Sequence, residues 1–237
     1  MTAVISSGHS KYVAGAIGLV DEVIQARKIT DCLYNVLSRS MKVIKFHDDI
    51  SKDKVTNVNT IVKFHNSQNR LADYSIHLNS VAGGTRETDI GIECLYKDDK
   101  YKQHAQDICN AISKATGLKN RGAKKRTDLG FLNGTNKPAF LLEAYFVNSV
   151  ADVRKMDEAH EIEAMCEAMA KVICKQWGYK FVAKTVVTVN ENTPSNWALD
   201  DWNWGIENRI TDGTKPLSVS TRQELVAMLH RYYKKFN

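Results

Sequence analysis

The sequence contains no run of about 18 uncharged apolar residues, the length that a membrane-spanning helix requires, so we expect no membrane span. Its N-terminal segment, Met1 to His9, also lacks the basic region and the long apolar stretch of a secretory signal. We therefore expect cytoplasmic synthesis without a signal peptide. Hydrophobic residues make up 43% of the 237 residues, which excludes wholesale disorder and collagen-like repeats.

Cysteines are few, odd in number and never spaced C-x-x-C. This pattern argues against a disulfide framework and against a zinc finger, and it favours small buried hydrophobic side chains. The five residues are Cys32, Cys94, Cys109, Cys166 and Cys174.

Acidic residues are outnumbered, with 27 Asp and Glu against 33 Lys and Arg, which gives a formal net charge of +6. This balance favours anionic surroundings such as nucleic acid, an anionic polymer or a cell wall. The sequence contains no recognised nucleic-acid motif, so we expect no nucleic-acid partner. A basic run at Lys119–Arg126 predicts a solvated loop that could attract an anionic wall.

Short runs rich in β-branched and aromatic residues alternate with segments in which apolar residues recur at helical spacing. The predicted strands are 4–6, 43–46, 74–78, 91–96 and 139–146. The predicted helices are 20–41, 55–71, 105–115 and 162–173. This alternation predicts an α/β fold with a twisted, largely parallel sheet flanked by helices.

The α/β pattern ends near residue 178, so we predict a main domain at 1–178, a linker at 179–193 and a small helical module at 194–237. Residues 180–192 are rich in Val and Thr and read as an extended linker or an edge strand. A capping box, Thr221 with Glu224, predicts the last helix. A module of roughly 40 residues is marginally stable alone, so it would lean on the main domain or on a second copy.

Two histidines and two glutamates fall at or near the predicted strand ends. His9 follows the first strand, Glu22 begins the next helix, and His77 lies just before the end of the third strand. Glu143 interrupts an apolar strand. Sites in open parallel sheets gather at the carboxyl ends of strands, so all four residues could converge there.

Two imidazoles and one carboxylate make a three-ligand zinc site with one position left for water. Zinc lowers the pKa of that water to about 7, and a second carboxylate must then carry its proton to the leaving group. Glu143 fits the second role.

Several segments resemble, in order, the signature blocks of zinc-dependent N-acetylmuramoyl-L-alanine amidases. They are Ser6–His9, Gly15–Glu22, Ala72–Ser80 and Pro138–Asn148, with Gly91–Glu93 and Arg121-Gly122 similar to intervening elements. The resemblance implies that His9, Glu22 and His77 bind Zn²⁺ and that Glu143 is the catalytic glutamate. It also implies peptidoglycan as the substrate, cleaved between N-acetylmuramic acid and L-alanine. The alternatives are a zinc peptidase that cuts within the stem peptide and a non-catalytic wall-binding protein.

The segment Trp197–Tyr232 resembles a single S-layer-homology repeat. Such repeats bind secondary wall polymers, although this segment could instead be a packing or dimerising element, which would make the protein a homo-oligomer. A catalytic domain with a binding tail and no signal peptide is similar to a phage or prophage endolysin. Such enzymes reach the wall once the membrane is permeabilised.

The remaining histidines allow simpler interpretations. The loop His47–Asp49 could be a second metal cluster, but a polar loop after a strand is the favoured interpretation. His65 lies in a polar spot before the third strand. The helical spacing around His104, His160 and His230 predicts that they are surface residues.

Overall fold

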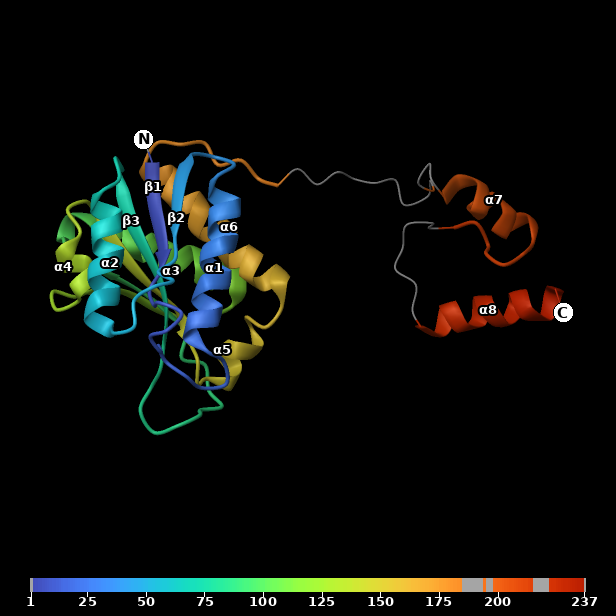
Figure 1. The fold of residues 1–237 in the computed structure, drawn as a ribbon, viewed down its shortest axis with the longest axis horizontal. Coiled ribbons are helices and arrows are strands. Elements are labelled where there is room, and N and C mark those ends of the chain that lie inside the picture. Colours follow the sequence, from blue (N-terminus) through green and yellow to red (C-terminus); the bar gives the residue numbers. More distant parts are fainter. Residues whose placement is uncertain (1, 185–193, 195–197, 215–221, 237) are drawn as a thin grey trace. The chain divides into compact units, whose positions relative to one another are not determined.

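This computed structural model describes residues 2–184, 194, 198–214 and 222–236. The chain forms two compact units, residues 1–184 and 185–237 (Figure 1). The strands of the first unit are β1 (Thr2–Ser7), β2 (Lys42–Phe46), β3 (Ala72–Asn79), β4 (Ile92–Tyr96), β5 (Asn120–Lys125) and β6 (Ala139–Phe146). Its helices are α1 (Glu22–Leu37), α2 (Lys54–Asn66), η1 (Asp99–Tyr101, a 3₁₀ helix), α3 (Lys102–Thr116), α4 (Gly130–Gly134), α5 (Val150–Arg154) and α6 (Ala159–Gln176).

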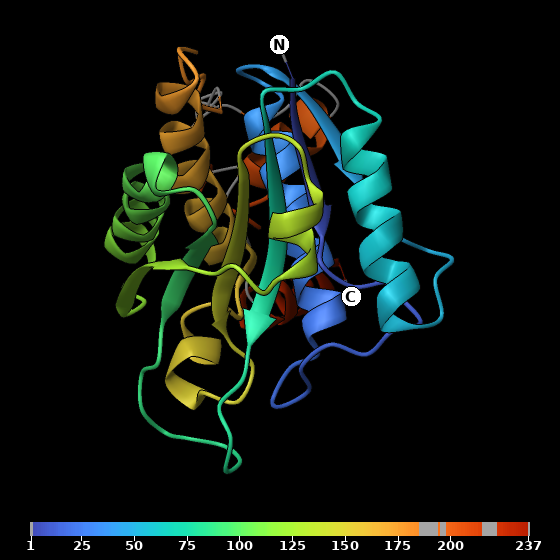
Figure 2. The same cartoon turned by 90° about the vertical axis from the view of Figure 1, so that its left-hand side faces the viewer.

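The strands form one sheet in the order β2-β1-β3-β6-β4-β5. Strands β2, β1, β3 and β6 are parallel, while β4 is antiparallel to β6 and parallel to β5. The largely parallel α/β fold that the sequence predicted is therefore confirmed. The carboxyl ends of β1, β3 and β6 meet the amino ends of β4 and β5 at one edge, which we call the site edge; it is the lower edge in Figure 2.

Helices cover both faces of the sheet (Figures 1 and 2). On one face, α1, α3 and α6 pack over the larger apolar core, which includes Leu33, Ile108 and Met165. On the other face, α2 and α4 cover a smaller core that includes Ile61 and Phe131. Helices α2 and α4 leave part of this second face uncovered by helix near the site edge, as Figure 2 shows.

All five cysteines are free thiols, as the sequence predicted. Four of them are buried, whereas Cys32 is half-buried.

The prediction of a solvated loop at Lys119–Arg126 is wrong, because most of this run is strand β5. It is an edge strand, and its charged side chains suit an exposed edge because they discourage pairing with other chains. Acidic neighbours also neutralise it: Lys125 pairs with Asp99 at 2.6 Å, and Arg126 pairs with Asp128 at 2.7 Å.

The surface position predicted for His104 is also wrong. The residue is 3% exposed on α3, where its ring packs against Phe140. Helical spacing alone could not reveal this, because α3 is covered on one side by α6 and on the other by the sheet. His160 and His230 are exposed, as predicted.

The second unit contains α7 (Leu199–Glu207) and α8 (Arg222–Phe236). Its helical character agrees with the sequence prediction. A turn follows α7, in which Asp212 accepts a hydrogen bond from the Thr214 backbone at 2.9 Å. Thr221 of the predicted capping box, Trp197 and residues 185–193 of the predicted linker lie outside the described residues. Among the described helices, none is long and apolar enough to cross a membrane.

Candidate metal centre and active site

Strand pairing brings two histidines to the site edge. Strands β1 and β3 are parallel neighbours, with Ser7 opposite Ile76, so the residues after them lie side by side. The Gly8 amide extends this pairing by donating to the Ile76 carbonyl at 2.9 Å. His9 therefore emerges beside His77, and their ring centroids are 5.0 Å apart.

Helix α1 supplies the third group. Asp21 caps the helix by accepting hydrogen bonds from the amides of Val23 and Ile24, which fixes Glu22 in its first turn. Glu22 Oε1 lies 3.1 Å from His9 Nε2 and 3.1 Å from His77 Nδ1. In the part of the chain that the structure describes, these three residues form the one group whose ligand atoms could share a metal, all within 4.8 Å of one another.

Glu22 is held as a carboxylate. Burial alone would raise its pKa, but hydrogen bonds from His77 and His9 outweigh burial and hold the pKa well below its usual value. The backbone also stabilises the charge, because Ala16 N donates to Oε2 at 2.6 Å and Leu78 N donates to Oε1 at 3.1 Å. The cluster thus offers an anionic ligand between two imidazoles, a donor set that fits Zn²⁺.

Two glycines make room for this cluster. A Cβ atom on Gly8 would lie 1.9 Å from the His77 ring. One on Gly15 would lie 2.5 Å from Glu22 Oε2 and 2.9 Å from the His9 ring. A side chain at either position would therefore push a candidate ligand out of place.

Glu143 lies one strand away from the cluster. It is opposite His77 in the β3–β6 register, so both side chains stand on the same face of the sheet. Its Oε2 atom is buried and has no hydrogen-bond partner among the described residues. Burial raises the pKa of Glu143 to about 8, and the carboxylates of Glu22 and Glu93 add to the shift. A buried carboxyl oxygen without a partner is uncommon and is typical of a functional group.

A β-bulge follows Glu143. His77 is opposite Glu143, but Asn79 is opposite Phe146, so β6 has one extra residue in this stretch. The bulge changes the alternation of side chains and brings Phe146 onto the face that carries His77 and Glu143. Bulges commonly re-aim side chains next to active sites.

The segment after β6 supports the loop that follows β3. The Asn148 side chain accepts from Val81 N at 3.2 Å and donates to the carbonyls of Val81 (2.8 Å) and Gly84 (2.9 Å). Asp152, fully buried, accepts from the amides of Ile90 and Gly91. The 80–91 loop is therefore tied down beside the site edge.

The other polar residues singled out in the sequence do not join the cluster. His47 contacts Ser7 Oγ at 2.8 Å, and Asp48 accepts from Ser51 N at 3.0 Å. Asp49 pairs with Arg27 at 2.8 Å. This segment follows β2 as a loop, which confirms the favoured interpretation.

His65 has a structural position. It is fully buried and bridges Ser6 Oγ (3.0 Å) and Asp73 Oδ1 (2.8 Å) between β1 and β3. Because no part of these three side chains reaches solvent, the arrangement braces the strands and is closed to substrate.

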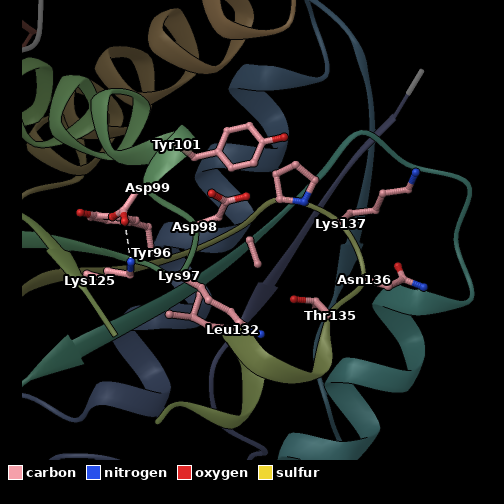
Figure 3. Close-up of a pocket in the computed structure, with 12 residues that line it drawn as sticks. Tyr96, Lys97, Asp98, Asp99, Tyr101, Lys125, Leu132, Thr135, Asn136 and Lys137 are labelled. Atoms are coloured by element: carbon pink, nitrogen blue, oxygen red, sulfur yellow. Dashed lines mark hydrogen bonds and ion pairs between the residues drawn. The ribbon is translucent and has the colours of Figure 1, made fainter. Parts of the chain in front are cut away.

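A separate cavity of about 630 Å³ opens where β6 begins, at the edge opposite the metal cluster (Figure 3). Tyr101 and Lys137 are among its lining residues, and Lys125 and Asp99 pair across one wall. None of the four predicted site residues lines it.

The fold and the His-Glu-His cluster define a class of protein, and comparison with known families agrees. A sequence profile of the N-acetylmuramoyl-L-alanine amidase family matches residues 3–175. This chain therefore belongs to the N-acetylmuramoyl-L-alanine amidase family, as the sequence motifs predicted.

Two proteins of Clostridium perfringens are similar in sequence. An uncharacterized 38.4 kDa protein is 32% identical over 203 residues, which cover 83% of this chain and 57% of that protein. A second protein is 32% identical over 160 residues, which cover 65% of this chain and 46% of its own length. The chain thus spans about half the length of the curated relatives that it matches.

Solved structures share the fold of the first unit. The catalytic domain of the CD27L endolysin targeting Clostridia difficile has a TM-score of 0.63 and 24% identity, and covers 74% of this chain and 97% of its own. The amidase AmiC2 of Nostoc punctiforme has a TM-score of 0.62 and 26% identity, and covers 75% of this chain and 97% of its own.

Proposed function

We propose that this protein is a zinc-dependent N-acetylmuramoyl-L-alanine amidase. It hydrolyses the amide between the lactyl group of N-acetylmuramic acid and the L-alanine of peptidoglycan. The convergence of His9, Glu22 and His77, with ligand atoms within 4.8 Å of one another, carries the proposal. Membership of the amidase family supports the same reaction.

Each residue has a distinct role in this proposal. Zinc held by His9, Glu22 and His77 would polarise the scissile carbonyl and make a water molecule acidic, with a pKa of about 7. Glu143 takes the proton of the attacking water through its unpartnered Oε2 and delivers it to the departing alanine nitrogen. Glu22 Oε2 stays bonded to Ala16 N, which fixes the orientation of the ligating carboxylate.

The environment of Glu143 suits proton transfer in both directions. Burial raises its pKa to about 8, whereas a nearby dication would lower it again. The two effects oppose each other, so the holoenzyme should keep this pKa near the working pH, where a general base can both accept and return a proton.

Glu143→Gln tests the role of Glu143 directly, because it keeps the shape of the side chain and removes the proton acceptor. We expect the variant to bind one zinc ion per chain, like the wild type, and to lose about 100-fold or more of its activity on cell walls. Glu87→Gln, an exposed glutamate in the 80–91 loop, is the matched control. Substantial wall lysis by Glu143→Gln would remove Glu143 from the proton-transfer role, and loss of zinc would make it a ligand instead.

Product analysis separates the proposed reaction from its alternatives. An amidase releases intact peptides that begin with alanine and leaves glycans without peptide. A stem-peptide protease leaves shortened peptides on the glycan. Detection of such peptides after digestion by this protein would overturn the proposal. Binding to walls without clearing, insensitive to a chelator, would support a non-catalytic wall-binding protein.

We further propose that residues 194–237 are a wall-binding or assembly module and that the protein acts as an endolysin. The resemblance of Trp197–Tyr232 to an S-layer-homology repeat supports a secondary wall polymer as its ligand. The fold shared with the catalytic domain of an endolysin supports the second point. In this setting the protein reaches peptidoglycan after the membrane is permeabilised.

A further inference from the structure

A network of charged side chains adjoins Glu143 and takes no part in the proposed proton transfer. Glu93 is directly opposite Glu143 in the antiparallel β4–β6 register, and its side chain is 7% exposed. Its carboxylate accepts hydrogen bonds from Asn79 Nδ2 (3.2 Å), Arg121 Nε (2.7 Å) and Lys124 Nζ (2.5 Å). Two cations thus share a single carboxylate, which leaves one positive charge in excess.

Arg121 and Lys124 are both partly exposed, and Arg121 is the member of this network that presents a planar guanidinium. The Arg121 guanidinium carbon lies 5.0 Å from the centre of the Phe146 ring. The β-bulge brings this ring onto the face of the sheet that carries His77 and Glu143. The Nε of Arg121 is engaged by Glu93, and its two terminal nitrogens make no hydrogen bond to any described residue. The side chain is 32% exposed, so it is not sealed inside the protein.

Such an arrangement favours an anion that can accept two parallel hydrogen bonds. A guanidinium presents its N–H groups as a rigid fork that matches a carboxylate. Glu93 and Phe146 already fix the orientation of this fork, so little conformational entropy is lost when a ligand binds.

The distance from the metal cluster identifies the part of the substrate that can reach Arg121. The strands β3, β6, β4 and β5 are consecutive, so the backbones of β3 and β5 are three strand spacings, roughly 14 Å, apart. The Arg121 side chain reaches back from β5 to the Phe146 ring on β6, which shortens the span to the metal cluster. An extended peptide covers such a span with at most about four residues. The lactyl carboxyl of muramic acid is consumed in the scissile amide, so the free carboxylates of the substrate lie on its peptide side.

We propose that Arg121 binds a carboxylate of the stem peptide and makes the enzyme selective for substrates that carry it. This inference rests on the proposed amidase function. It places the peptide across the face of the sheet that carries His77, Glu143 and Glu93, in the direction of β5, and it makes Arg121 a specificity-determining residue.

Soluble muropeptides that differ only in one carboxylate provide the test. One pair carries either the free α-carboxylate or the carboxamide on the second residue, and another pair varies the C-terminal carboxylate in the same way. We expect the wild type to prefer the free acid in one pair by about tenfold in kcat/KM. Arg121→Gln should lose that preference, mainly through KM, and should cleave the amidated member at the wild-type rate.

Lys125→Gln is the matched control, because it removes one positive charge from the same strand at a residue bonded to Asp99 instead of Glu93. It should keep the wild-type preference. Equal rates for acid and amide in both pairs with the wild type would overturn the inference, as would an Arg121→Gln variant that keeps the preference. Equal slowing of acid and amide would also overturn it, because it would show a purely structural role. If the wild type cleaves no muropeptide at all, the amidase proposal itself fails.

Discussion

At the metal cluster, a position without a side chain, Gly8, matters as much as the ligands. Gly8 precedes His9, and its Cα faces the His77 ring so closely that a Cβ atom would overlap the ring at 1.9 Å. The two imidazoles can approach the same carboxylate only because this space is free. The sequence resemblance pointed to the ligands, but the steric role of Gly8 depends on the pairing of β1 with β3.

Gly8→Ala should therefore disrupt the site. We expect the His77 ring to move by about 1 Å or more, with loss of about 100-fold in activity, because misplacement on this scale has such an effect. Bound zinc, measured by elemental analysis after dialysis, should fall in parallel. Gly117→Ala is the control: this residue ends α3 at a φ of 71° with open space around it, so the change should lower stability by roughly 1 kcal/mol and leave zinc and activity intact. Full zinc content in Gly8→Ala would contradict the steric argument.

The four predicted site residues and the Arg121 network differ in how far sequence could reveal them. His9 and His77 stand at or near strand ends and Glu22 at a helix start, so the periodicity of the sequence was enough to suggest their convergence. The position of Arg121 depends on the order β6-β4-β5 and on the extra residue after Glu143. Neither feature leaves a local trace in the sequence, although Glu93 and Arg121 belong to the two segments that resemble intervening elements of the amidase family.

Among the secondary-structure elements, the long ones were predictable and the short or polar ones were not. Strand β6 and helix α6 carry strong apolar patterns. Strand β5 has the sequence Asn120–Lys125 with almost no apolar residue, and it forms because β4 offers a free edge. Helices α4 and α5 are too short for a periodic pattern to emerge.

Helix α3 carries a buried titratable group that should affect stability at low pH. The Tyr74 hydroxyl accepts a hydrogen bond from Trp177 Nε1 at 2.9 Å and lies 2.9 Å from His104 Nε2. Burial lowers the pKa of His104 from 6.5 to about 4. Between these values the unfolded chain binds the proton and the folded chain does not, so the free energy of unfolding falls as the pH decreases.

His104→Gln should reduce this pH dependence. The contribution of His104 is fully present above pH 6.5 and is lost as the pH falls toward 4, a change of roughly 3 kcal/mol. Urea unfolding at several pH values between 7 and 4.5 measures it, and the stability of the variant should vary with pH less than that of the wild type by an amount of this order. His160→Gln, on the exposed side of α6, is the control and should follow the wild type. Parallel curves for His104→Gln and the wild type would contradict the assignment.

For the whole molecule, the first unit holds all the groups that the proposed reaction needs. The metal cluster, Glu143 and the Arg121 network all lie within residues 1–184. The polypeptide after α6 also contributes to this unit: Tyr179 and Phe181 pack against its core, and Val182 N donates to Ser40 Oγ at 2.8 Å. The sequence could not predict these contacts, because the α/β pattern ends near residue 178 and single aromatic residues outside a helix or strand show no periodicity.

Two truncations test this division. A chain ending at Lys184 should cleave soluble muropeptides at the full-length rate and bind whole cell walls more weakly, if the second unit binds the wall. A chain ending at Trp177 should be less stable, because it loses the contacts of Tyr179 and Phe181. We expect about 2 kcal/mol for these two partly buried rings, which corresponds to a Tm lower by roughly 5 °C. Calorimetry, muropeptide kinetics and wall sedimentation measure the three effects. Loss of muropeptide cleavage by the folded 1–184 chain would show that the second unit takes part in catalysis, whereas unchanged wall binding would remove its proposed role as a wall anchor.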